Sequence, residues 1–344
     1  MIELCGMTPE EITLYMKTLG QGAFRGAQVY AWAMKGVPVE EMTNLSKDLR
    51  EKIAQQAVTN PVKIREERVS KLDGTRKYLF ELADGNLIEG VLMRYKYGCT
   101  LCVSTQVGCK MGCVFCASTL EGCARNLTPG ELVGQVLCAN KVLEASGERV
   151  HNLVLMGSGE PFDNYDNVVK FLRLVIDERG LNLSVRSISL STCGLVERMR
   201  AFAEEGLPIT LSLSLHAPND RIRKKLMPVA QAYTMEKTLA ACKNYVEKTG
   251  RRVIFEYAMA EGINCDIACA DELASRLRGL QCHVNLIPLN AVEERGMRPP
   301  DEKTVDAFLH RLEILHISVT KRREMGDDIA GACGQLRRGV IGSR

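Results

Sequence analysis

The sequence lacks the features that would place the protein in a membrane or outside the cell. No apolar run is long enough to cross a bilayer, because charged residues interrupt each of the longer ones. The first residues, MIELCGMTPEE, are acidic where a secretory signal peptide would be basic. A large charge excess is also missing: the net charge of +3 neither requires nor excludes a nucleic-acid partner. We therefore expect a cytoplasmic globular protein that does not bind membranes.

Cysteine, in contrast, is abundant, with 14 residues in a chain of 344. In a cytosolic protein of this size, so many thiols indicate free, metal-binding or redox-active groups rather than a disulfide framework. Three of them, Cys109, Cys113 and Cys116, lie within the single stretch GCKMGCVFC. This cluster is the strongest chemical signal in the sequence.

The first sixty residues read as helical. In the stretch TPEE, Thr8 is placed to cap a helix, Pro9 occupies its first position, and Glu11 can close a capping box. Helical patterning continues with interruptions to about Gln56, by the usual tolerance at element boundaries. The recurring Lys and Arg residues in this region are, taken alone, typical of an ordinary solvated face.

A β-meander is predicted next, over residues 61–98. The runs KIREERVS, RKYLFEL and LIEGVLMRY have the composition of strands. They are separated by Asp73-Gly74 and Asp84-Gly85, and Asp-Gly between such runs is a strong hairpin signal.

From Cys99 onward the pattern alternates between strands and helices. The predicted strands are TLCVSTQV, HNLVLM, RSISLS, PITLSLSL, RRVIFEYAM and HVNLIPL. The predicted helices lie near residues 128–146, 165–179, 195–205, 235–249 and 267–279. Six strands with helical crossovers predict a parallel α/β sheet with right-handed connections, either open or curled into a partial barrel.

Polar and glycine residues follow each predicted strand. Such sheets and barrels place their sites at the carboxyl ends of the strands. The segments that follow the strands are the cysteine cluster, GSGEP, STCG, SLH, EY and PLN. These six segments therefore predict one common pocket.

Two metal sites are compatible with the cysteine spacing. A four-cysteine zinc site would use Cys99, Cys102, Cys113 and Cys116, but its two pairs lie unusually close together and Cys109 has no role in it. A 4Fe–4S cluster would use Cys109, Cys113 and Cys116, and would leave one iron without a protein ligand. The spacing and the parallel α/β context favour the cluster.

The CxxxCxxC pattern, with Phe115 before the last cysteine and a strand before the first, resembles the radical S-adenosylmethionine (SAM) superfamily. The resemblance implies a partial (β/α)6 TIM-like barrel. It also implies a 4Fe–4S cluster whose open iron binds the amino and carboxylate groups of SAM. Reduction of bound SAM then yields a 5′-deoxyadenosyl radical, while the protein supplies orientation and excludes side reactions.

Five further motifs narrow the resemblance. LCVSTQVGC, MGSGEPFDN, SLHAPND, NLIPLN and ACGQL occur in this order, and together they resemble the RlmN/Cfr family of RNA adenine methyltransferases over nearly the whole chain. The resemblance implies three parts. These are a small helical RNA-binding accessory domain (1–60), a β-meander connector (61–98), and a radical SAM core with a C-terminal methyl-carrier cysteine loop (99–344).

The family resemblance also implies a reaction with two working thiols and a base. Cys333, in ACGQL, matches the cysteine that first takes a methyl group from SAM and then carries it to the adenine. Cys102 matches the cysteine that releases the product by forming a transient disulfide, and Glu89 matches the general base. Read alone, either cysteine is more typical of a small buried apolar residue, and Glu89 of an exposed strand charge.

Contacts to SAM are implied at matching positions after the strands. His216, read alone, is more typical of a structural histidine. Ser158 stands where many relatives have Met, which affects local packing only. The matching residues are Gly159, Glu160, Ser191, Ser214, Leu215, His216 and Asn290.

The activity implied is methylation of carbon 2 of an adenine in 23S rRNA, and also in tRNA, with a flavodoxin- or ferredoxin-like electron donor and a monomeric enzyme. The motifs EPFDN, STCG and HAPND look more like RlmN than like Cfr. Cfr-type methylation at carbon 8 and a zinc-dependent RNA-binding protein without catalysis remain alternatives. Basic segments that could contact RNA phosphates are residues 221–225, 321–323 and 337–338.

Overall fold

The computed structural model describes residues 1–290 and 292–331 of the chain. The ACGQL motif, with its predicted methyl carrier Cys333, lies outside the described residues, as do the basic residues 337–338. None of the helices in the described part is both long and apolar enough to cross a bilayer.

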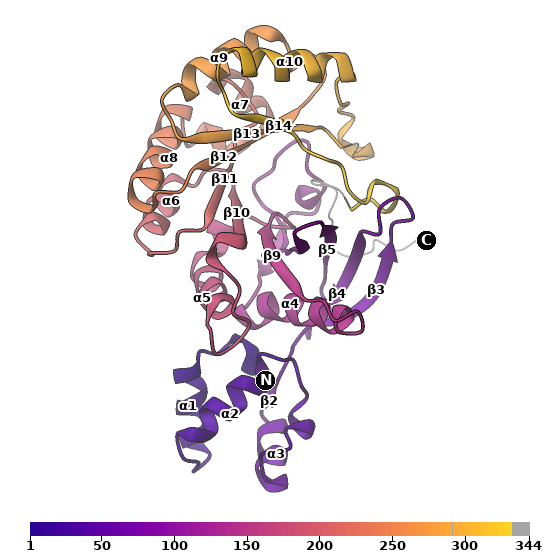
Figure 1. Cartoon of the computed structure of the whole chain (residues 1–344), viewed down its shortest axis with the longest axis vertical. Coiled ribbons are helices and arrows are strands. Elements are labelled where there is room, and N and C mark those ends of the chain that lie inside the picture. Colours follow the sequence, from indigo (N-terminus) through magenta and orange to yellow (C-terminus); the bar gives the residue numbers. More distant parts are fainter. Residues whose placement is uncertain (291, 332–344) are drawn as a thin grey trace.

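The N-terminal region is helical, as predicted. It contains α1 (Pro9–Thr18), α2 (Phe24–Ala33) and α3 (Lys47–Ala54), together with a short parallel pair formed by β1 (Ile2–Glu3) and β2 (Ala57–Val58). The Thr8 side chain accepts from the Glu11 amide and the Glu11 carboxylate accepts from the Thr8 amide, which confirms the capping box. In Figure 1 these helices form a lobe below the rest of the molecule.

The remainder of the chain is built on one sheet of ten strands. The three strands of the meander and β6 are antiparallel, whereas β6 and the strands that follow it in the sheet are parallel. The order across the sheet is β14 (Val319–Lys321), β13 (Cys282–Pro288), β12 (Val253–Met259), β11 (Thr210–Ser214), β10 (Ile188–Thr192), β9 (Val150–Leu155), β6 (Gly98–Cys102), β5 (Leu87–Tyr95), β4 (Arg76–Glu81) and β3 (Lys63–Val69).

The predicted hairpins are present, but two details of the parallel part differ from the prediction. The run TLCVSTQV is divided into β6 and a separate short strand, β7 (Gln106–Gly108). β7 pairs with β8 (Cys123–Asn126), which follows the cysteine cluster in the sequence. A further parallel strand, β14, follows the six predicted ones at the sheet edge. It was missed because a strand of three residues with a basic end carries no alternating apolar pattern.

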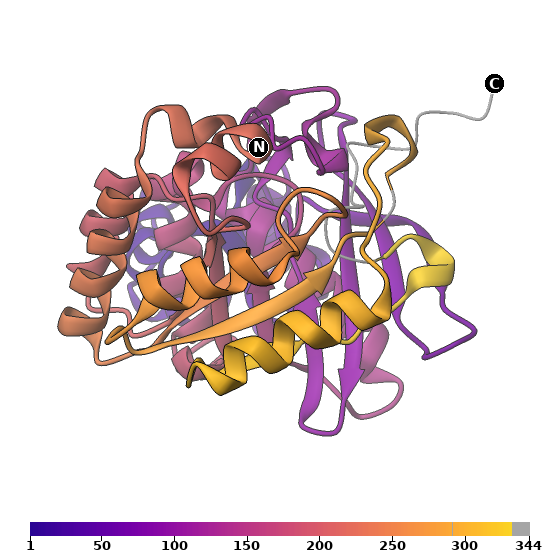
Figure 2. The same ribbon diagram turned by 90° about the horizontal axis from the view of Figure 1, so that it is seen from above.

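Helices cover the outer face of the curled sheet, so the parallel part forms an open barrel (Figures 1 and 2). The five predicted helices are present, and α7 and α10 were not predicted. The helices are α4 (Pro129–Glu144), α5 (Tyr165–Ile176), α6 (Val196–Ala203), α7 (Asp220–Leu226), α8 (Met235–Thr249), α9 (Ile267–Leu277) and α10 (Glu302–Ile314).

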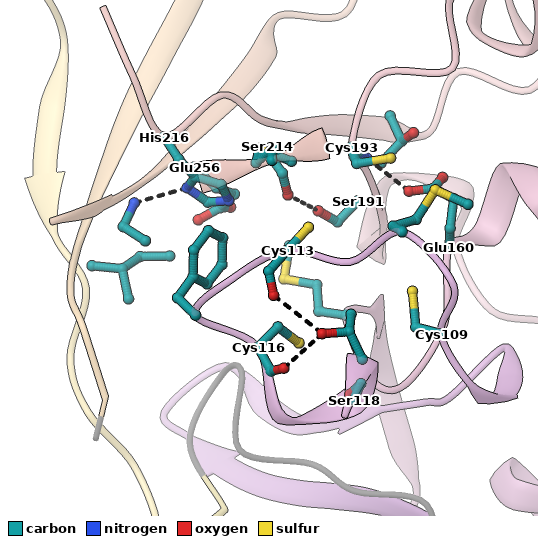
Figure 3. A pocket seen from close by; sticks show the side chains of 18 of the residues that line it. Cys109, Cys113, Cys116, Ser118, Glu160, Ser191, Cys193, Ser214, His216 and Glu256 are labelled. Atoms are coloured by element: carbon teal, nitrogen blue, oxygen red, sulfur yellow. Dashed lines mark hydrogen bonds between the residues drawn. The ribbon is translucent and has the colours of Figure 1, made fainter. Parts of the chain in front are cut away.

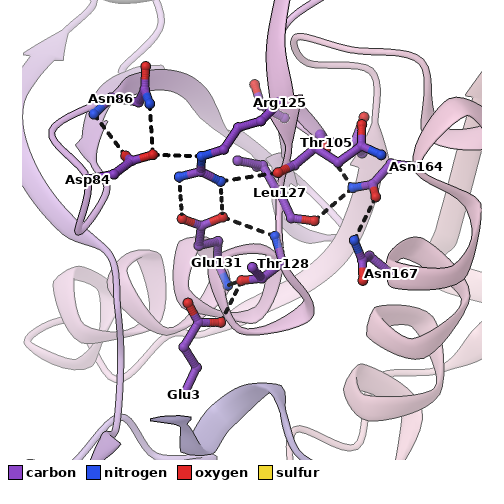
Figure 4. Close-up of polar contacts among 12 residues, drawn as sticks. Glu3, Asp84, Asn86, Thr105, Arg125, Leu127, Thr128, Glu131, Asn164 and Asn167 are labelled. Carbon is purple, nitrogen blue, oxygen red and sulfur yellow. Dashed lines mark hydrogen bonds and ion pairs between the residues drawn. The ribbon is translucent and has the colours of Figure 1, made fainter. Parts of the chain in front are cut away.

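A polar network around Arg125 ties the N-terminal segment, the meander and the barrel together (Figure 4). The guanidinium forms two bonds of 2.7 and 2.8 Å to the Glu131 carboxylate and a third of 2.7 Å to Asp84 in the second hairpin turn. Glu131 also caps α4 by accepting from the Thr128 amide, and the Thr128 hydroxyl donates to Glu3. Because β8 carries Arg125, the network fixes one end of the cysteine loop.

Replacing Arg125 with methionine is expected to lower the free energy of unfolding by about 2–4 kcal/mol, because it leaves the buried Glu131 carboxylate without its cation. Urea denaturation would measure the loss. The matched control is Arg173→Met, which removes an exposed ion pair with Glu205 and should cost less than about 1 kcal/mol. Equal losses in the two variants would contradict a buried role for this network.

Candidate functional site

A pocket opens where the cysteine loop faces the carboxyl ends of the parallel strands (Figure 3). It encloses about 1020 Å³, including the space at its mouth, which is enough for a ligand of nucleoside size. Nine of the predicted metal and SAM residues line it, whereas the side chain of Leu215 is buried outside the lining. The nine are Cys109, Cys113, Cys116, Gly159, Glu160, Ser191, Ser214, His216 and Asn290.

The cysteine loop is held in shape by its own sequence. Gly108 has a φ of +80°, and a Cβ there would overlap the carbonyl oxygen of Gly122, so only glycine fits. The hydroxyl of Thr119 lies 3.1 Å from the carbonyl oxygen of Cys113 and 3.0 Å from that of Cys116. These contacts turn the loop back on itself, so its three cysteines line one side of the pocket.

The cysteines fit a 4Fe–4S cluster better than a single metal ion. Among residues 1–290 and 292–331, no three His, Cys, Asp or Glu side chains converge closely enough to bind one ion. Cluster ligands need not converge in this way, because each thiolate binds a different iron. Burial raises the pKa of the Cys109 thiol to about 12 and also raises that of Cys113, so a cationic centre is needed to ionise them at neutral pH.

The alternative zinc site does not form. It requires Cys99 and Cys102 beside Cys113 and Cys116, but neither Cys99 nor Cys102 lines the pocket. Cys99 lies near the start of β6, and its thiol is instead 3.6 Å from the Glu148 carboxylate.

The turn after β9 brings main chain and a carboxylate into the pocket. Gly159 has a φ of +110°, and a Cβ there would lie 2.7 Å from the backbone nitrogen of Gln106, so the turn requires glycine. Glu160 is buried, and its carboxylate accepts from the amides of Phe162 and Cys193 at 3.0 and 2.7 Å. Burial raises the pKa of Glu160. Since a carboxylate has more lone pairs than these two bonds use, Glu160 can still receive the ammonium group of SAM.

Histidine and serine side chains supply further polar atoms from the neighbouring strands. The hydroxyls of Ser191 and Ser214 lie 3.4 Å apart at the ends of β10 and β11. His216 has a φ of +55°, and its Nδ1 accepts from the Ala258 amide at 2.9 Å. Burial lowers the pKa of His216 to about 3, so the ring is neutral and carries its proton on Nε2. The His216 ring also packs edge-on against Phe115 of the cysteine loop.

Two charged residues at the pocket have no role predicted from the sequence, although Glu256 belongs to the EY segment that helped to predict the pocket. Glu256, on β12, is buried there; burial raises its pKa, and it accepts from Asn285 at 2.9 Å. An acidic residue inside the apolar run VIFEYAM was the available signal. Arg322 had been grouped with residues that contact RNA, but it lines the pocket, 3.9 Å from Glu256. In the other basic segment, Arg223 is buried and donates to the carbonyl oxygen of Cys193, so it is not exposed to RNA.

Cys102 lies in a second, smaller pocket that adjoins the first. The two pockets share Met156, Ile287, Asn290 and Arg322 as lining residues. Gly331, the last described residue, also lines the second pocket. Glu89 is buried on β5, beside β6 in the sheet, with its Oε1 2.9 Å from the Nζ of Lys77.

Two family models match the chain. Residues 103–267 match the radical SAM superfamily, whose members use a 4Fe–4S cluster and SAM. Residues 2–59 match the ribosomal RNA large subunit methyltransferase N-terminal domain.

Relatives match over nearly the full length of the chain. A protein of Alkaliphilus oremlandii with the name "Probable dual-specificity RNA methyltransferase RlmN" is 49% identical over 98% of this chain and 98% of its own. One of the same name from Lachnoclostridium phytofermentans is 52% identical over 98% of this chain and 94% of its own. The crystal structure of a radical SAM methyltransferase from Sphaerobacter thermophilus superposes with a TM-score of 0.95 at 41% identity, covering 98% of this chain and 99% of that one. The chain therefore has the radical SAM fold and belongs to the RlmN family.

Proposed function

We propose that the protein methylates carbon 2 of an adenine in 23S rRNA, and in tRNA, by way of a methylated cysteine. The observation that carries this proposal is the pair of adjoining pockets. One holds the three cysteines and the predicted SAM residues, and the other holds Cys102 and the chain segment that leads to Cys333. A methyltransferase that transferred a methyl group directly from SAM would not need a second pocket lined by a cysteine.

The cluster and SAM supply the radical chemistry when bound. Cys109, Cys113 and Cys116 would hold the cluster through three of its irons. Glu160 would bind the ammonium group of SAM, and His216, as a neutral donor, would bind an acceptor on the same ligand. The apolar walls around these residues keep water away from the reaction.

Cys102 and Cys333 would act as a thiol pair. Gly331 lines the pocket that contains Cys102. Cys333 follows two residues later in the sequence, and two residues span at most about 7 Å, so the chain length allows Cys333 to approach this pocket. In the release step the Cys102 thiolate attacks the Cys333 sulfur. An S–S bond forms, the bond between that sulfur and the transferred carbon breaks, and the electron pair stays on the carbon, which takes a proton to become a methyl group. A cellular dithiol reductant then reduces the disulfide.

Glu89 would remove the proton from the adenine carbon before release, and the cluster, when bound, would supply the acceptor for the single electron that radical addition leaves on the ring. It lies on β5, two residues before Val91, and Val91 pairs directly with Cys102. Side chains at such positions share one face of the sheet, so the base and the resolving thiol face the same space.

RNA recognition is supported by an aromatic pair, one ring of which lines the second pocket. The rings of Tyr95 and Tyr97 stack with centroids 5.0 Å apart, and Tyr97 is 69% exposed. Tyr95 and Arg323 both line that pocket. An exposed ring stacked on one that lines the same pocket as a guanidinium suits an unstacked base and its phosphate, as an adenine drawn out of structured RNA would require.

The test of the proposal is mass analysis of ribosomal and transfer RNA from a strain lacking the gene. Loss of 2-methyladenosine from 23S rRNA, and from tRNA, with recovery on complementation, is the expected result. Loss of 8-methyladenosine instead would contradict methylation at carbon 2. An unchanged nucleoside profile would contradict the proposed RNA methyltransferase activity.

We further propose that the enzyme works as a monomer in the cytoplasm and receives electrons from a flavodoxin- or ferredoxin-like protein. The proposed reaction requires Cys102 and the three cysteines of the loop as thiols, and the reducing cytoplasm is the compartment that maintains thiols.

A further inference from the structure

We propose that Lys77 is a positioning residue that fixes the general base Glu89 and the start of the carrier segment to each other. The inference rests on the proposed function, because it takes Glu89 as the base and Cys333 as the methyl carrier. Its basis is that one buried ammonium group contacts both parts of the reaction machinery.

The sheet register places Lys77 among the reacting groups. Lys77 on β4 pairs with Val91 on β5, and Val91 pairs with Cys102 on β6. Directly paired residues project to the same face of a sheet, and Glu89 projects with Val91 because it lies two residues away. Lys77, Glu89 and Cys102 therefore occupy one face, beside the second pocket.

The ammonium group of Lys77 makes two contacts on this face. Its Nζ lies 2.9 Å from Oε1 of Glu89 and donates to the carbonyl oxygen of Ala330 at 3.1 Å. The side chains of Lys77 and Glu89 are each only 10% exposed. A buried lysine needs such partners because burial disfavours an unpaired ammonium group, and losing either partner would leave charge poorly compensated.

The segment that contains Ala330 is docked on the first hairpin turn. Asp73 accepts from the Gly326 amide at 2.9 Å, and Asp328 accepts from the Lys71 amide at 2.9 Å. These bonds hold the outer part of the segment, and Lys77 holds its inner end, three residues before Cys333. Since three residues span at most about 10 Å, the Lys77 contact limits where the carrier cysteine can reach.

The two contacts together give Lys77 a defined role. Glu89 must lie beside the ring proton of the same adenine that is attached to Cys333. Because Lys77 binds the Glu89 carboxylate and the main chain that leads to Cys333, it sets the distance between these two groups. An error of about 1 Å in such an arrangement can lower a rate about a hundredfold.

The test compares Lys77→Met with Lys77→Arg and with the control Arg76→Met. Arg76 is the next residue on β4, projects to the other face, and pairs with Glu67 at 2.6 Å. Lys77→Met is expected to slow RNA methylation at least about tenfold, Lys77→Arg to stay within about threefold of wild type, and Arg76→Met to match wild type. Equal activity of Lys77→Met and wild type would overturn the inference.

A double-mutant cycle with Glu89→Gln shows whether Lys77 acts through the base. If it does, the combined loss is smaller than the product of the two separate losses. Losses that multiply would mean that Lys77 acts independently of Glu89, and would overturn the inference.

Hydrogen exchange on the unreacted protein tests the second contact without any catalysis. Lys77→Met should speed the exchange of amides in residues 326–331, and Arg76→Met should not. Unchanged exchange in Lys77→Met would overturn the anchoring role. A wild-type enzyme that methylated no RNA would count against the proposed function instead, and the exchange measurement would still decide whether Lys77 holds the segment.

Discussion

Replacing Cys102 with alanine is expected to leave RNA covalently attached to the protein through Cys333. The methyl carrier can still load and add to the adenine, but no thiol is then available to attack the Cys333 sulfur and release the product. Denaturing gel electrophoresis should show a protein–RNA species, and peptide mapping should place the attached nucleotide on Cys333. Free methylated RNA should fall to background.

Cys99→Ala is the matched control for this variant. Cys99 lies three residues earlier on the same strand, and its thiol faces Glu148 rather than the second pocket. It should turn over like wild type. Normal turnover of Cys102→Ala would contradict the resolving role of Cys102.

Replacing Cys113 with alanine is expected to abolish the iron–sulfur centre and, with it, SAM cleavage. Cys113 lines the pocket together with Cys109 and Cys116, and the other cysteine in the lining, Cys193, comes from the turn after β10 rather than from the cysteine loop. Anaerobically purified protein should lose most of its iron and sulfide, and 5′-deoxyadenosine formation should fall at least about a thousandfold.

Cys123→Ser is the control, because Cys123 lies on β8, close to the loop in sequence, but does not line the pocket. It should keep its iron and its SAM cleavage. A Cys113→Ala protein that retained a full cluster would refute the assignment of the three ligands.

The parts of the fold that could be predicted from the sequence are those with local causes. The capping boxes at Thr8 and Thr128 and the two Asp-Gly hairpins depend on residues a few positions apart, and all are present. The cysteine cluster is local in the same sense, because its spacing and glycines fix the shape of the loop.

The parts that could not be predicted depend on contacts between distant segments. Nothing near Lys77 in the sequence indicates that it meets Glu89 and Ala330, because these contacts follow from sheet register and from the path of the C-terminal segment. Arg223 lies in a basic run that reads as a solvated face, yet tertiary packing buries it. For the same reason the sequence does not show that Arg322, in another basic run, lines the pocket beside the cysteine loop.

The most direct test of the two-thiol reaction uses SAM with a trideuterated methyl group, purified enzyme under anaerobic conditions, an electron donor and unmodified RNA. If Cys333 carries the methyl group and loses one hydrogen from it before addition, the product 2-methyladenosine should retain two deuterium atoms. Mass spectrometry of the released nucleosides would measure this. A methyl group with all three deuterium atoms would contradict the carrier mechanism, because it would show direct transfer from SAM.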